Sequence, residues 1–338
     1  MMSKIFWKGK KVFITGYEGF LGSNLTKTLL ESEVNVCGLD IVTGRKKTIL
    51  SRNDFSRMEI FRGSVENLSL INEIIKKHKI EIIFHLAAEA LVEDCLKNPL
   101  KGFSTNIKGT WNILESARLN SCVKGIVIAS SDKAYGSCKS LPYKEDTRLS
   151  GIHPYDVSKS CADLIAHTYY HSYRVPAAVT RCGNIFGPGD FNFSRIIPDA
   201  MRSMINNRTL MVRSDGKFTR DYIYVDDVVK GYILLAEKMH KLKLYGEAFN
   251  FSDENPVSVI DLVKIIYKIC GKKANYKILK KAKYEIKHQY LSSRKARKIL
   301  GWKPGHSLEE GLRKTFDWYV EILGTGKGRG KGKGKGKG

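Results

Sequence analysis

The sequence predicts an α/β protein, with a Rossmann-like, doubly wound parallel sheet and a smaller C-terminal α/β substrate-binding lobe. In the first half of the chain, short apolar runs alternate with amphipathic segments of about 10–15 residues, as in parallel strands joined by helices. A glycine-rich turn directly follows the first apolar run. Beyond Gly183 the alternation becomes irregular, and 338 residues suffice for about two domains.

Strands are expected where short apolar runs occur, because both faces of a parallel sheet are covered. These runs are 10–15, 34–40, 80–87, 124–130 and 177–181. Helices are expected where apolar residues recur every three or four positions. These segments are 21–31, 68–78, 106–119 and 154–174. Within 106–119, one face is expected to hold Ile107, Trp111, Leu114 and Ala117.

The second unit is expected to lie over the carboxyl edge of the sheet, where open α/β sheets bind ligands. Its expected helices are 196–206, 225–238, 257–270 and 309–323, and its expected strand is 209–212. We therefore divide the chain into a Rossmann domain (1–183), a lobe (184–323) and a tail (324–338). Some segments of the lobe are allowed to return to the Rossmann sheet.

Composition points to a soluble globular protein, with 42% hydrophobic and 27% charged residues. There is no apolar run near the roughly 18 residues that span a bilayer, so no membrane association is expected. The N-terminus lacks the pattern of a signal peptide, and a cytoplasmic location is expected. The seven cysteines are scattered without a C-x-x-C pair, which argues against disulfides and a structural zinc site. No metal is expected.

The chain is strongly basic, with a net charge of +24. The tail alternates glycine with lysine or arginine and cannot bury apolar surface, so we expect it to be disordered. It could bind nucleic acid nonspecifically, or serve only as a solubilising extension. The basic body is compatible with an anionic ligand.

Gly16, Gly19 and Gly22 lie between the first strand and the first helix. Glycines allow a tight turn and close backbone approach, and the helix N-terminus then offers N–H groups to a pyrophosphate. Asp40, at the end of the next strand, would accept hydrogen bonds from the adenosine ribose, which favours NAD over NADP. The basic segment 45–47 weakens this preference. The alternative is an ordinary tight turn.

Tyr155 and Lys159 are four residues apart on one expected helix, which Pro154 begins, so their side chains share a face. A cation beside a phenol lowers the pKa of the phenol, and a phenolate can take the proton of an alcohol while hydride leaves the same carbon. The alternative is an ordinary surface pair on a helix. The order of the glycine turn and the Tyr155/Lys159 pair indicates redox chemistry on an alcohol carbon.

The chain resembles the extended short-chain dehydrogenase/reductase superfamily, in particular its nucleotide-sugar epimerases and dehydratases. The matching stretches extend from residue 12 to about 304 and are TGYEGFLGS, FHLAAEALV, STNIKGTWNILE, ASSDKAYG, HPYDVSK, RCGNIFGPGD, RDYIYVDDVV and ILGWKP. The resemblance implies NAD as cofactor and a nucleotide sugar as substrate. It implies cofactor-site positions at Gly16, Tyr17, Gly19, Phe20, Leu21, Gly22, Asp40, Ser64, Val65, Leu86, Ala87, Ala88, Asn106, Tyr155 and Lys159.

Within that set, the resemblance implies that Asn106 supports the active-site backbone. It also implies that Asn184 contacts the substrate diphosphate, that Arg220 holds the nucleotide, and that Arg195 belongs to the substrate site. The family further implies a homodimer, in which helices 106–119 and 154–174 pair with their copies in a four-helix bundle. The alternative is that this amphipathic face packs within its own chain.

The resemblance implies that the reaction depends on the segment Ser131-Asp132-Lys133. Ser131 occupies the position that hydrogen-bonds the sugar 4-hydroxyl. Dehydratases carry an acid and a base at the next two positions, and the Asp-Lys pair is similar to that of CDP-glucose 4,6-dehydratases. Asp132 would protonate the leaving 6-hydroxyl and Lys133 would remove the C5 proton. Burial or the nearby charge of Lys159 would favour the neutral amine that such a base requires.

Several residues depart from the pattern of that subfamily. Ser64 stands where family members usually carry an aspartate that binds adenine, and RDYIYVDD is closer to epimerases and dTDP-glucose dehydratases. Three functions therefore stay open: an NAD-dependent 4,6-dehydratase, with CDP-glucose as the favoured substrate; a UDP-sugar 4-epimerase; and a noncatalytic binding protein that contacts nucleic acid through its tail. The complete Ser131/Tyr155/Lys159 set favours an enzyme.

Overall fold

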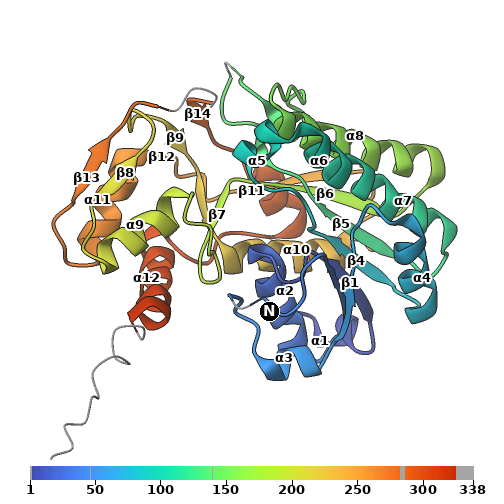
Figure 1. Ribbon diagram of the computed structural model, residues 1–338. Coiled ribbons are helices and arrows are strands. Elements are labelled where there is room, and N and C mark those ends of the chain that lie inside the picture. The colour runs from blue at the N-terminus through green and yellow to red at the C-terminus, as the bar shows by residue number, and fades with distance from the viewer. Residues whose placement is uncertain (1, 46, 139, 282–285, 325–338) are drawn as a thin grey trace, which may run out of the picture.

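The computed structural model describes residues 2–45, 47–138, 140–281 and 286–324. Its centre is a seven-stranded sheet in the order β11-β6-β5-β4-β1-β2-β3, and every neighbouring pair is parallel (Figure 1). The strands are β1 (Lys11–Thr15), β2 (Asn35–Asp40), β3 (Glu59–Arg62), β4 (Ile82–His85), β5 (Gly125–Ala129), β6 (Ala177–Cys182) and β11 (Ala248–Phe251). The predicted doubly wound fold is confirmed.

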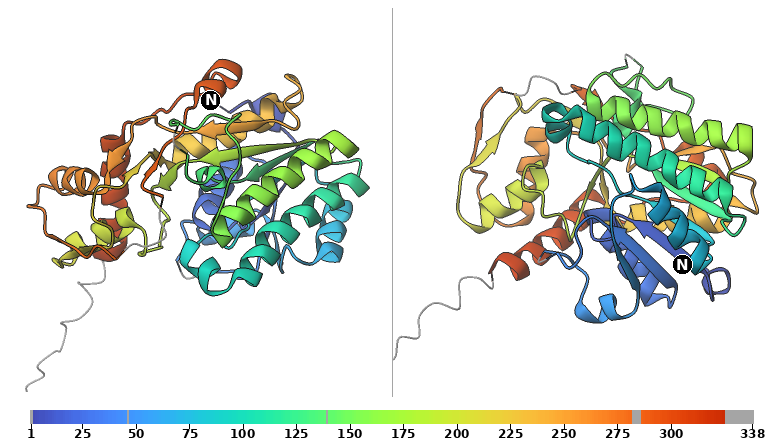
Figure 2. Two further views of the ribbon diagram at one scale, coloured as in Figure 1. Left: turned by 90° about the horizontal axis from the view of Figure 1, so that it is seen from above. Right: turned by 45° about the vertical axis from the view of Figure 1, so that its right-hand side comes forward.

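The sheet separates two apolar cores. In β1, Val12 and Ile14 enter one core while Phe13 enters the other, since successive side chains of a strand point to opposite faces. α2 (Phe20–Glu31) and α10 (Val225–Met239) pack together over the first core. α4 (Leu68–His78), α7 (Gly109–Leu119) and α8 (Pro154–Tyr173) cover the second, and the right view of Figure 2 shows α7 and α8 side by side.

α10 and β11 return from the second half of the chain to the Rossmann unit. α10 was expected in the lobe, but it packs on α2 and β5, and β11 extends the central sheet beside β6. Tyr232 and Leu235 of α10 are fully buried. The large apolar face of this helix therefore packs into the first core, on one face of the central sheet. The domain boundary at residue 183 stays a prediction.

Two expected helices have different beginnings in the structure. The segment expected as 106–119 begins at Pro99 and comprises α6 (Pro99–Phe103), the π-helical η1 (Ser104–Lys108) and α7. The expected apolar face is divided, because Trp111 is 42% exposed whereas Leu114 is buried. The segment expected as 257–270 begins with the short strand β12 (Val257–Ser258), and α11 (Val259–Ile269) follows with Ser258 as its N-cap.

Among the described residues, the lobe contains helices and short strands on one side of the Rossmann unit (Figure 1). α9 (Ile196–Ile205), α11 and α12 (Leu308–Gly324) pack against one another. Two strand pairs and one three-stranded sheet accompany them: β7 (Asn184–Phe186) with β10 (Tyr222–Tyr224), β8 (Leu210–Val212) with β13 (Tyr276–Ile278), and β12 with β9 (Thr219–Arg220) and β14 (His288–Gln289).

The remaining elements are short: α1 (Lys4–Trp7), α3 (Arg52–Ser56), α5 (Val92–Lys97), the 3₁₀ turn η2 (Asp132–Tyr135) and the π-helical η3 (Ala296–Leu300). Among the described residues, no helix combines the length and the apolar character needed to span a membrane. Most of the tail, residues 325–338, lies outside the described residues. The expectation that the tail is disordered therefore stays a prediction.

Candidate active site

A cavity of about 1230 Å³ lies between the carboxyl ends of the sheet strands and the lobe. It is lined by all five expected catalytic residues, Ser131, Asp132, Lys133, Tyr155 and Lys159. Ser131 was also expected to contact the substrate, and the other three expected substrate residues, Asn184, Arg195 and Arg220, line the cavity as well. The structure thus brings residues 131 to 220 to one site, and their individual roles stay predictions.

The glycine turn is held tightly between β1 and α2. Gly16 has a φ of +72°, which L side chains rarely adopt, and a Cβ on Gly22 would lie 2.0 Å from the carbonyl oxygen of Gly16. Gly19 is the N-cap of α2, and no side chain of the described residues caps this end. The first N–H groups of the helix therefore remain available for a pyrophosphate.

Tyr17 does not line the cavity, although it was expected in the cofactor site. Its ring is fully buried in the core, and its hydroxyl donates to Glu18 Oε1 at 2.7 Å. The side chain therefore points away from the place where a cofactor would lie. The other residues expected in the turn, Gly16, Gly19, Phe20, Leu21 and Gly22, do line the cavity.

Glu18 is a residue that the sequence reasoning missed. Its carboxylate accepts hydrogen bonds from the backbone N–H groups of Gly44 and Arg45, each at 2.6 Å. This carboxylate joins the glycine turn to the loop after β2. The only local signal was an acid within the turn, between Gly16 and Gly19.

Asp40 lines the cavity at the end of β2, as expected for a ribose ligand. Its Oδ1 atom accepts from Arg45 Nη2 at 2.9 Å, so the nearby cation is engaged by the carboxylate. Lys46, which the same expectation included, lies outside the described residues. A carboxylate at this position still disfavours a ribose 2′-phosphate, and the geometry fits NAD better than NADP.

Ser64, Val65, Leu86, Ala87 and Ala88 line the cavity beside the glycine turn, as expected.

Asn106 does not line the cavity but supports the backbone beside it. Its amide oxygen accepts from the N–H of Glu89 at 2.8 Å, and its amide nitrogen donates to the carbonyl of Glu89 at 3.1 Å. The same nitrogen donates to Ser158 Oγ at 2.8 Å, so Asn106 links the loop after β4 to α8. The geometry agrees with a supporting role and not with direct cofactor contact.

Tyr155 and Lys159 lie in the first turns of α8, which begins at Pro154. Lys159 Nζ donates to the carbonyl of Ala129 at 2.8 Å and lies 6.0 Å from the centre of the Tyr155 ring. Burial lowers the pKa of Lys159 to about 8.

The expected net lowering of the Tyr155 pKa is wrong. Burial raises the pKa of the Tyr155 phenol above its ordinary value, and a hydrogen bond with Ser131 and the charge of Arg195 offset this only in part. The amine of Lys159 is directed to the Ala129 carbonyl, and desolvation outweighs the attraction that the spacing suggested.

Ser131 and Asp132 form a hydrogen-bonded pair at the start of η2. Ser131 Oγ accepts from the N–H of Lys133 at 3.2 Å and donates to Asp132 Oδ1 at 3.0 Å. Asp132 is only 4% exposed, and burial raises the pKa of its carboxyl, which favours a protonated acid. Its other oxygen, Oδ2, has no hydrogen-bond partner among the described residues.

Lys133 reaches across to the lobe. Its Nζ donates to Gln289 Oε1 at 3.4 Å, and Gln289 is fully buried in β14. Gln289 was missed because it is 156 residues away from Lys133 in the chain and carries no motif. Only the pairing of β14 with β9 brings it to the site.

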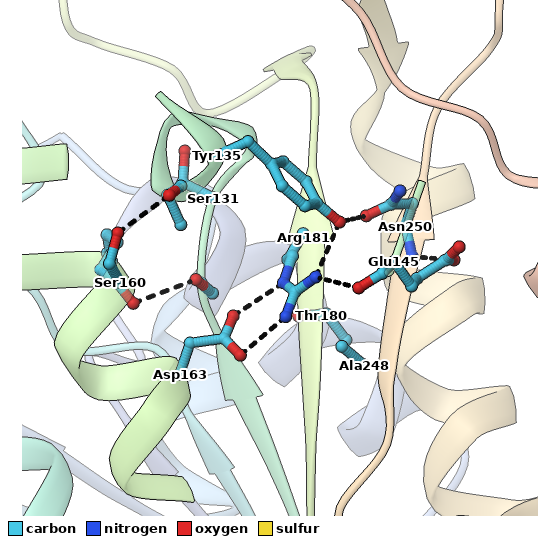
Figure 3. A network of polar contacts seen from close by, with 12 residues as sticks. Ser131, Tyr135, Glu145, Ser160, Asp163, Thr180, Arg181, Ala248 and Asn250 are labelled. Atoms are coloured by element: carbon cyan, nitrogen blue, oxygen red, sulfur yellow. Dashed lines mark hydrogen bonds and ion pairs between the residues drawn. The ribbon is translucent and has the colours of Figure 1, made fainter. Parts of the chain in front are cut away.

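A buried polar network holds η2 against α8 (Figure 3). The hydroxyl of Tyr135, the last residue of η2, donates to Asn250 Oδ1 at 2.7 Å and accepts from Arg181 Nη1 at 2.8 Å. Arg181 binds the carboxylate of Asp163 on α8 through two bonds of 2.7 and 2.8 Å. Ser160 on α8 donates to the carbonyl of Ala134 at 2.9 Å. The network therefore fixes the position of η2, which carries Asp132 and Lys133, relative to α8, which carries Tyr155.

The polar residues of the lobe line the opposite wall of the cavity. Arg195 Nη1 pairs with Asp190 Oδ2 at 3.2 Å. Asn184 donates to the carbonyl of Asp221 at 3.3 Å, and Arg220 Nη1 donates to the carbonyls of Thr219 and Lys287 at 3.0 and 3.1 Å. Two guanidinium groups and an amide suit the phosphates of a nucleotide sugar.

The structure combines a Rossmann sheet, a glycine turn without a side-chain cap, a Ser/Tyr/Lys set and a polar lobe. This combination defines the extended short-chain dehydrogenase/reductase class. Within that class, the GDP-mannose 4,6 dehydratase family matches residues 13–315, and the chain belongs to this family of nucleotide-sugar dehydratases and epimerases.

Relatives of both reaction types resemble the chain. The CDP-glucose 4,6-dehydratase of Salmonella typhimurium is 32% identical, over 94% of this chain and 93% of that enzyme. The UDP-glucuronate 4-epimerase of Thermodesulfobacterium geofontis is 31% identical, over 92% and 96%. The crystal structure of Bacillus anthracis dTDP-glucose 4,6-dehydratase in complex with NAD has a TM-score of 0.83, with 27% identity over 93% of this chain and 97% of that one.

Proposed function

We propose that the protein is an NAD-dependent nucleotide-sugar 4,6-dehydratase and that its substrate is CDP-glucose. One observation carries the choice of a dehydratase: the cavity contains an adjacent acid and amine, Asp132 and Lys133, beside Tyr155. Asp132 is buried and keeps one carboxyl oxygen without a partner among the described residues. An elimination needs such an acid and base, whereas an epimerisation at C4 does not.

NAD fits the residues of the turn. The tight Gly16–Gly22 approach, the uncapped start of α2 and the carboxylate of Asp40 supply the groups that a dinucleotide requires. When bound, NAD supplies the acceptor for the hydride from C4 and, once reduced, the donor of a hydride to C6.

The chain's own residues move the protons. Tyr155 takes the proton of the sugar 4-hydroxyl, and Ser131 and the charge of Arg195 favour its phenolate form. The resulting 4-ketone acidifies the C5 hydrogen, which Lys133 removes. Asp132 donates its proton to the departing 6-hydroxyl, which leaves as water. The product is a 4-keto-6-deoxy sugar.

CDP-glucose is favoured by the Asp132-Lys133 pair and by the similarity to the Salmonella typhimurium enzyme. Asn184 and Arg220 would hold the diphosphate and the nucleotide, and Arg195 would contact the sugar end, because its charge acts on Tyr155.

Mass spectrometry tests the proposal. The purified protein is incubated with NAD and with CDP-, dTDP-, UDP- and GDP-hexoses in parallel. Loss of about 18 mass units from CDP-glucose is expected, since elimination removes one water. The K133M variant should lose this activity, whereas K264M, which changes an exposed lysine of α11, should keep it. Dehydration of another nucleotide sugar would overturn the substrate and leave the reaction class intact.

The rival function is a 4-epimerase acting on a UDP-sugar. It is favoured by the motif RDYIYVDD and by the 31% identity to the UDP-glucuronate 4-epimerase. An epimerase would produce an unchanged mass with an inverted C4 centre, which NMR detects. That result, retained in K133M, would remove the proposed roles of Asp132 and Lys133.

A homodimer through α6, α7 and α8 forms part of the proposal. These helices expose Leu100, Trp111 and Leu164, with exposed fractions of 78%, 42% and 57%. Large apolar side chains gathered on neighbouring helices are typical of an interface. Analytical ultracentrifugation should show a dimer that L164E converts to a monomer. A monomeric wild-type protein would contradict this arrangement.

A further inference from the structure

The proposed dehydration leaves two residues in the wrong protonation state at the end of each turnover, and the inference rests on that proposed function. Tyr155 gains the proton of the sugar 4-hydroxyl. Asp132 loses a proton to the 6-hydroxyl, whose C6–O bond breaks. The proton that Lys133 takes from C5 returns to C5 when hydride reaches C6. One proton must therefore pass from Tyr155 to Asp132 before the next cycle.

Ser131 lies between these two groups. Its hydroxyl donates to Asp132 Oδ1 at 3.0 Å, and Ser131 lines the same cavity as Tyr155, whose phenolate form it favours. A serine hydroxyl has one proton to donate and two lone pairs with which to accept. Once Tyr155 has gained its proton, Ser131 directs its own proton to Asp132, and its lone pairs are then available to the Lys133 N–H and the Tyr155 hydroxyl. The hydrogen-bonded chain joins the residue that gains a proton to the residue that loses one.

Solvent has poor access to either end of this chain. Tyr155 is 9% exposed and Asp132 is 4% exposed. With the sugar in the cavity, exchange with bulk water would be further restricted. An internal path is therefore more direct than release of a proton from Tyr155 and capture of another by Asp132.

We propose that Ser131 transfers the proton from Tyr155 to Asp132 and so restores the acid before the next cycle. The Tyr155 O–H bond breaks as a new O–H bond forms on Ser131. The original Ser131 O–H bond breaks as its proton joins Asp132 Oδ1. No electron pair leaves the three residues, and no oxidant, reductant or further reactant is needed.

The two oxygens of Asp132 suit two tasks. Oδ1 receives the proton from Ser131, whereas Oδ2 is buried without a partner among the described residues, so the carboxyl group must turn to present a protonated oxygen to the leaving 6-hydroxyl. The terminal torsion of a carboxyl group is broad and roughly two-fold, so a rotation exchanges the two oxygens. A proton received on the Ser131 side can thus be delivered on the substrate side.

This transfer is needed for dehydration and not for epimerisation. In an epimerase the proton taken from the 4-hydroxyl returns to the same oxygen, and Tyr155 is restored directly. A hydrogen bond from Ser131 to a neighbouring acid serves no purpose in that cycle. In this proposal, the Ser131–Asp132 contact returns a proton to Asp132 in the elimination cycle and has no corresponding role in an epimerase.

Rapid-quench kinetics with NAD and CDP-glucose tests the transfer. The S131A variant should slow the first turnover, because Ser131 also favours the Tyr155 phenolate, and should slow later turnovers about 10²-fold further, the low end of the range for a lost proton-transfer group. About one product per active site should therefore form before the slower phase. Acetic acid in the buffer should accelerate the slow phase, because it can reprotonate Asp132 from outside. S131T keeps a hydroxyl and should restore steady turnover without a burst. D132N should form no product even in the first cycle.

The outcomes separate the possible failures. If S131A slows the first and later turnovers equally, Ser131 only positions the sugar and the relay is wrong. A burst whose slow phase ignores acetic acid would indicate slow product release and would also overturn the relay. If wild-type protein removes no water from any of the four nucleotide-hexoses of the panel, the proposed function itself fails.

Discussion

The cofactor half and the catalytic half of the cavity are constructed in different ways. The cofactor half centres on the backbone of one strand–turn–helix segment, Gly16–Gly22, which neighbouring residues in the chain determine, and Asp40, Ser64 and residues 86–88 complete its lining. The catalytic half collects side chains from η2, α8 and β14, which long-range contacts hold together. The comparison teaches that a binding site for a common ligand can be local, whereas positioned acid/base chemistry requires the whole fold.

Removal of the Tyr155 phenol oxygen should distinguish the two halves most clearly, because it should affect catalysis and not NAD binding. Y155F is expected to lower kcat by about 10³-fold, because the proton acceptor for the 4-hydroxyl is lost. NAD affinity should change little, since the glycine turn is untouched. Steady-state kinetics and calorimetric NAD titration measure the two effects. An equal loss of NAD affinity would show that the halves are not separable.

The buried Arg181–Asp163 pair tests whether the catalytic half depends on tertiary contacts. R181M leaves Asp163 buried without its charged partner and should lower the free energy of unfolding by about 3–5 kcal/mol. Denaturant unfolding measures this change.

The double variant R181M/D163L is the control for that prediction. Replacement of both partners should recover much of the stability, because no lone charge then stays buried. Since Arg181 also holds Tyr135, kcat should fall more than NAD affinity in both variants. Unchanged kcat in a folded R181M protein would contradict the role of the network.

The glycine turn offers a graded test of the cofactor half. G22A should abolish tight NAD binding and cost about 1–3 kcal/mol of stability, because its Cβ would lie 2.0 Å from the Gly16 carbonyl oxygen. G19A is the matched control for the loss of stability, since its Cβ would lie 3.2 Å from the same oxygen and needs only a small adjustment. Equal effects of the two substitutions would argue against this tight packing.

Lys159 belongs to both halves, and its burial predicts a dependence of stability on pH. The pKa of Lys159 is lowered to about 8 in the fold, so the unfolded chain binds more protons between about pH 8 and pH 10. The contribution of Lys159 to stability should therefore rise with pH across this window, by about 1–3 kcal/mol. Denaturant unfolding of wild type and K159M at pH 7.5 and 9.5 measures the difference. A contribution that falls with pH would contradict the burial effect.

Several features could be predicted from the sequence because nearby residues decide them. The helix Leu68–His78 has the expected bounds, since its apolar periodicity and its Asn67 cap are local. The glycine turn follows from steric demands within seven residues, and Tyr155 and Lys159 share a face because a helix has 3.6 residues per turn.

Other features depend on contacts that the local pattern does not contain. α10 has a strongly apolar face, but its local sequence does not reveal which core this face joins. The face joins the Rossmann core because α10 packs against α2 and β5. Tyr17 turns inward because Glu18 accepts its hydroxyl, and the pKa of Tyr155 rises because burial outweighs the nearby amine. Local spacing does not reveal how much water each group loses.

The sequence by itself determined the fold class and the dinucleotide turn, because short-range sterics and periodicity control them. Its resemblance to a known family indicated the residues that are proposed to carry the chemistry. Only the tertiary structure decided which of these residues meet and in what electrostatic environment. Gln289 reaches Lys133 through the pairing of β14 with β9, and the oxygens of Asp132 acquire different surroundings by burial. Both depend on packing between segments far apart in the chain, and that packing sets the distances and the desolvation on which proton transfer depends.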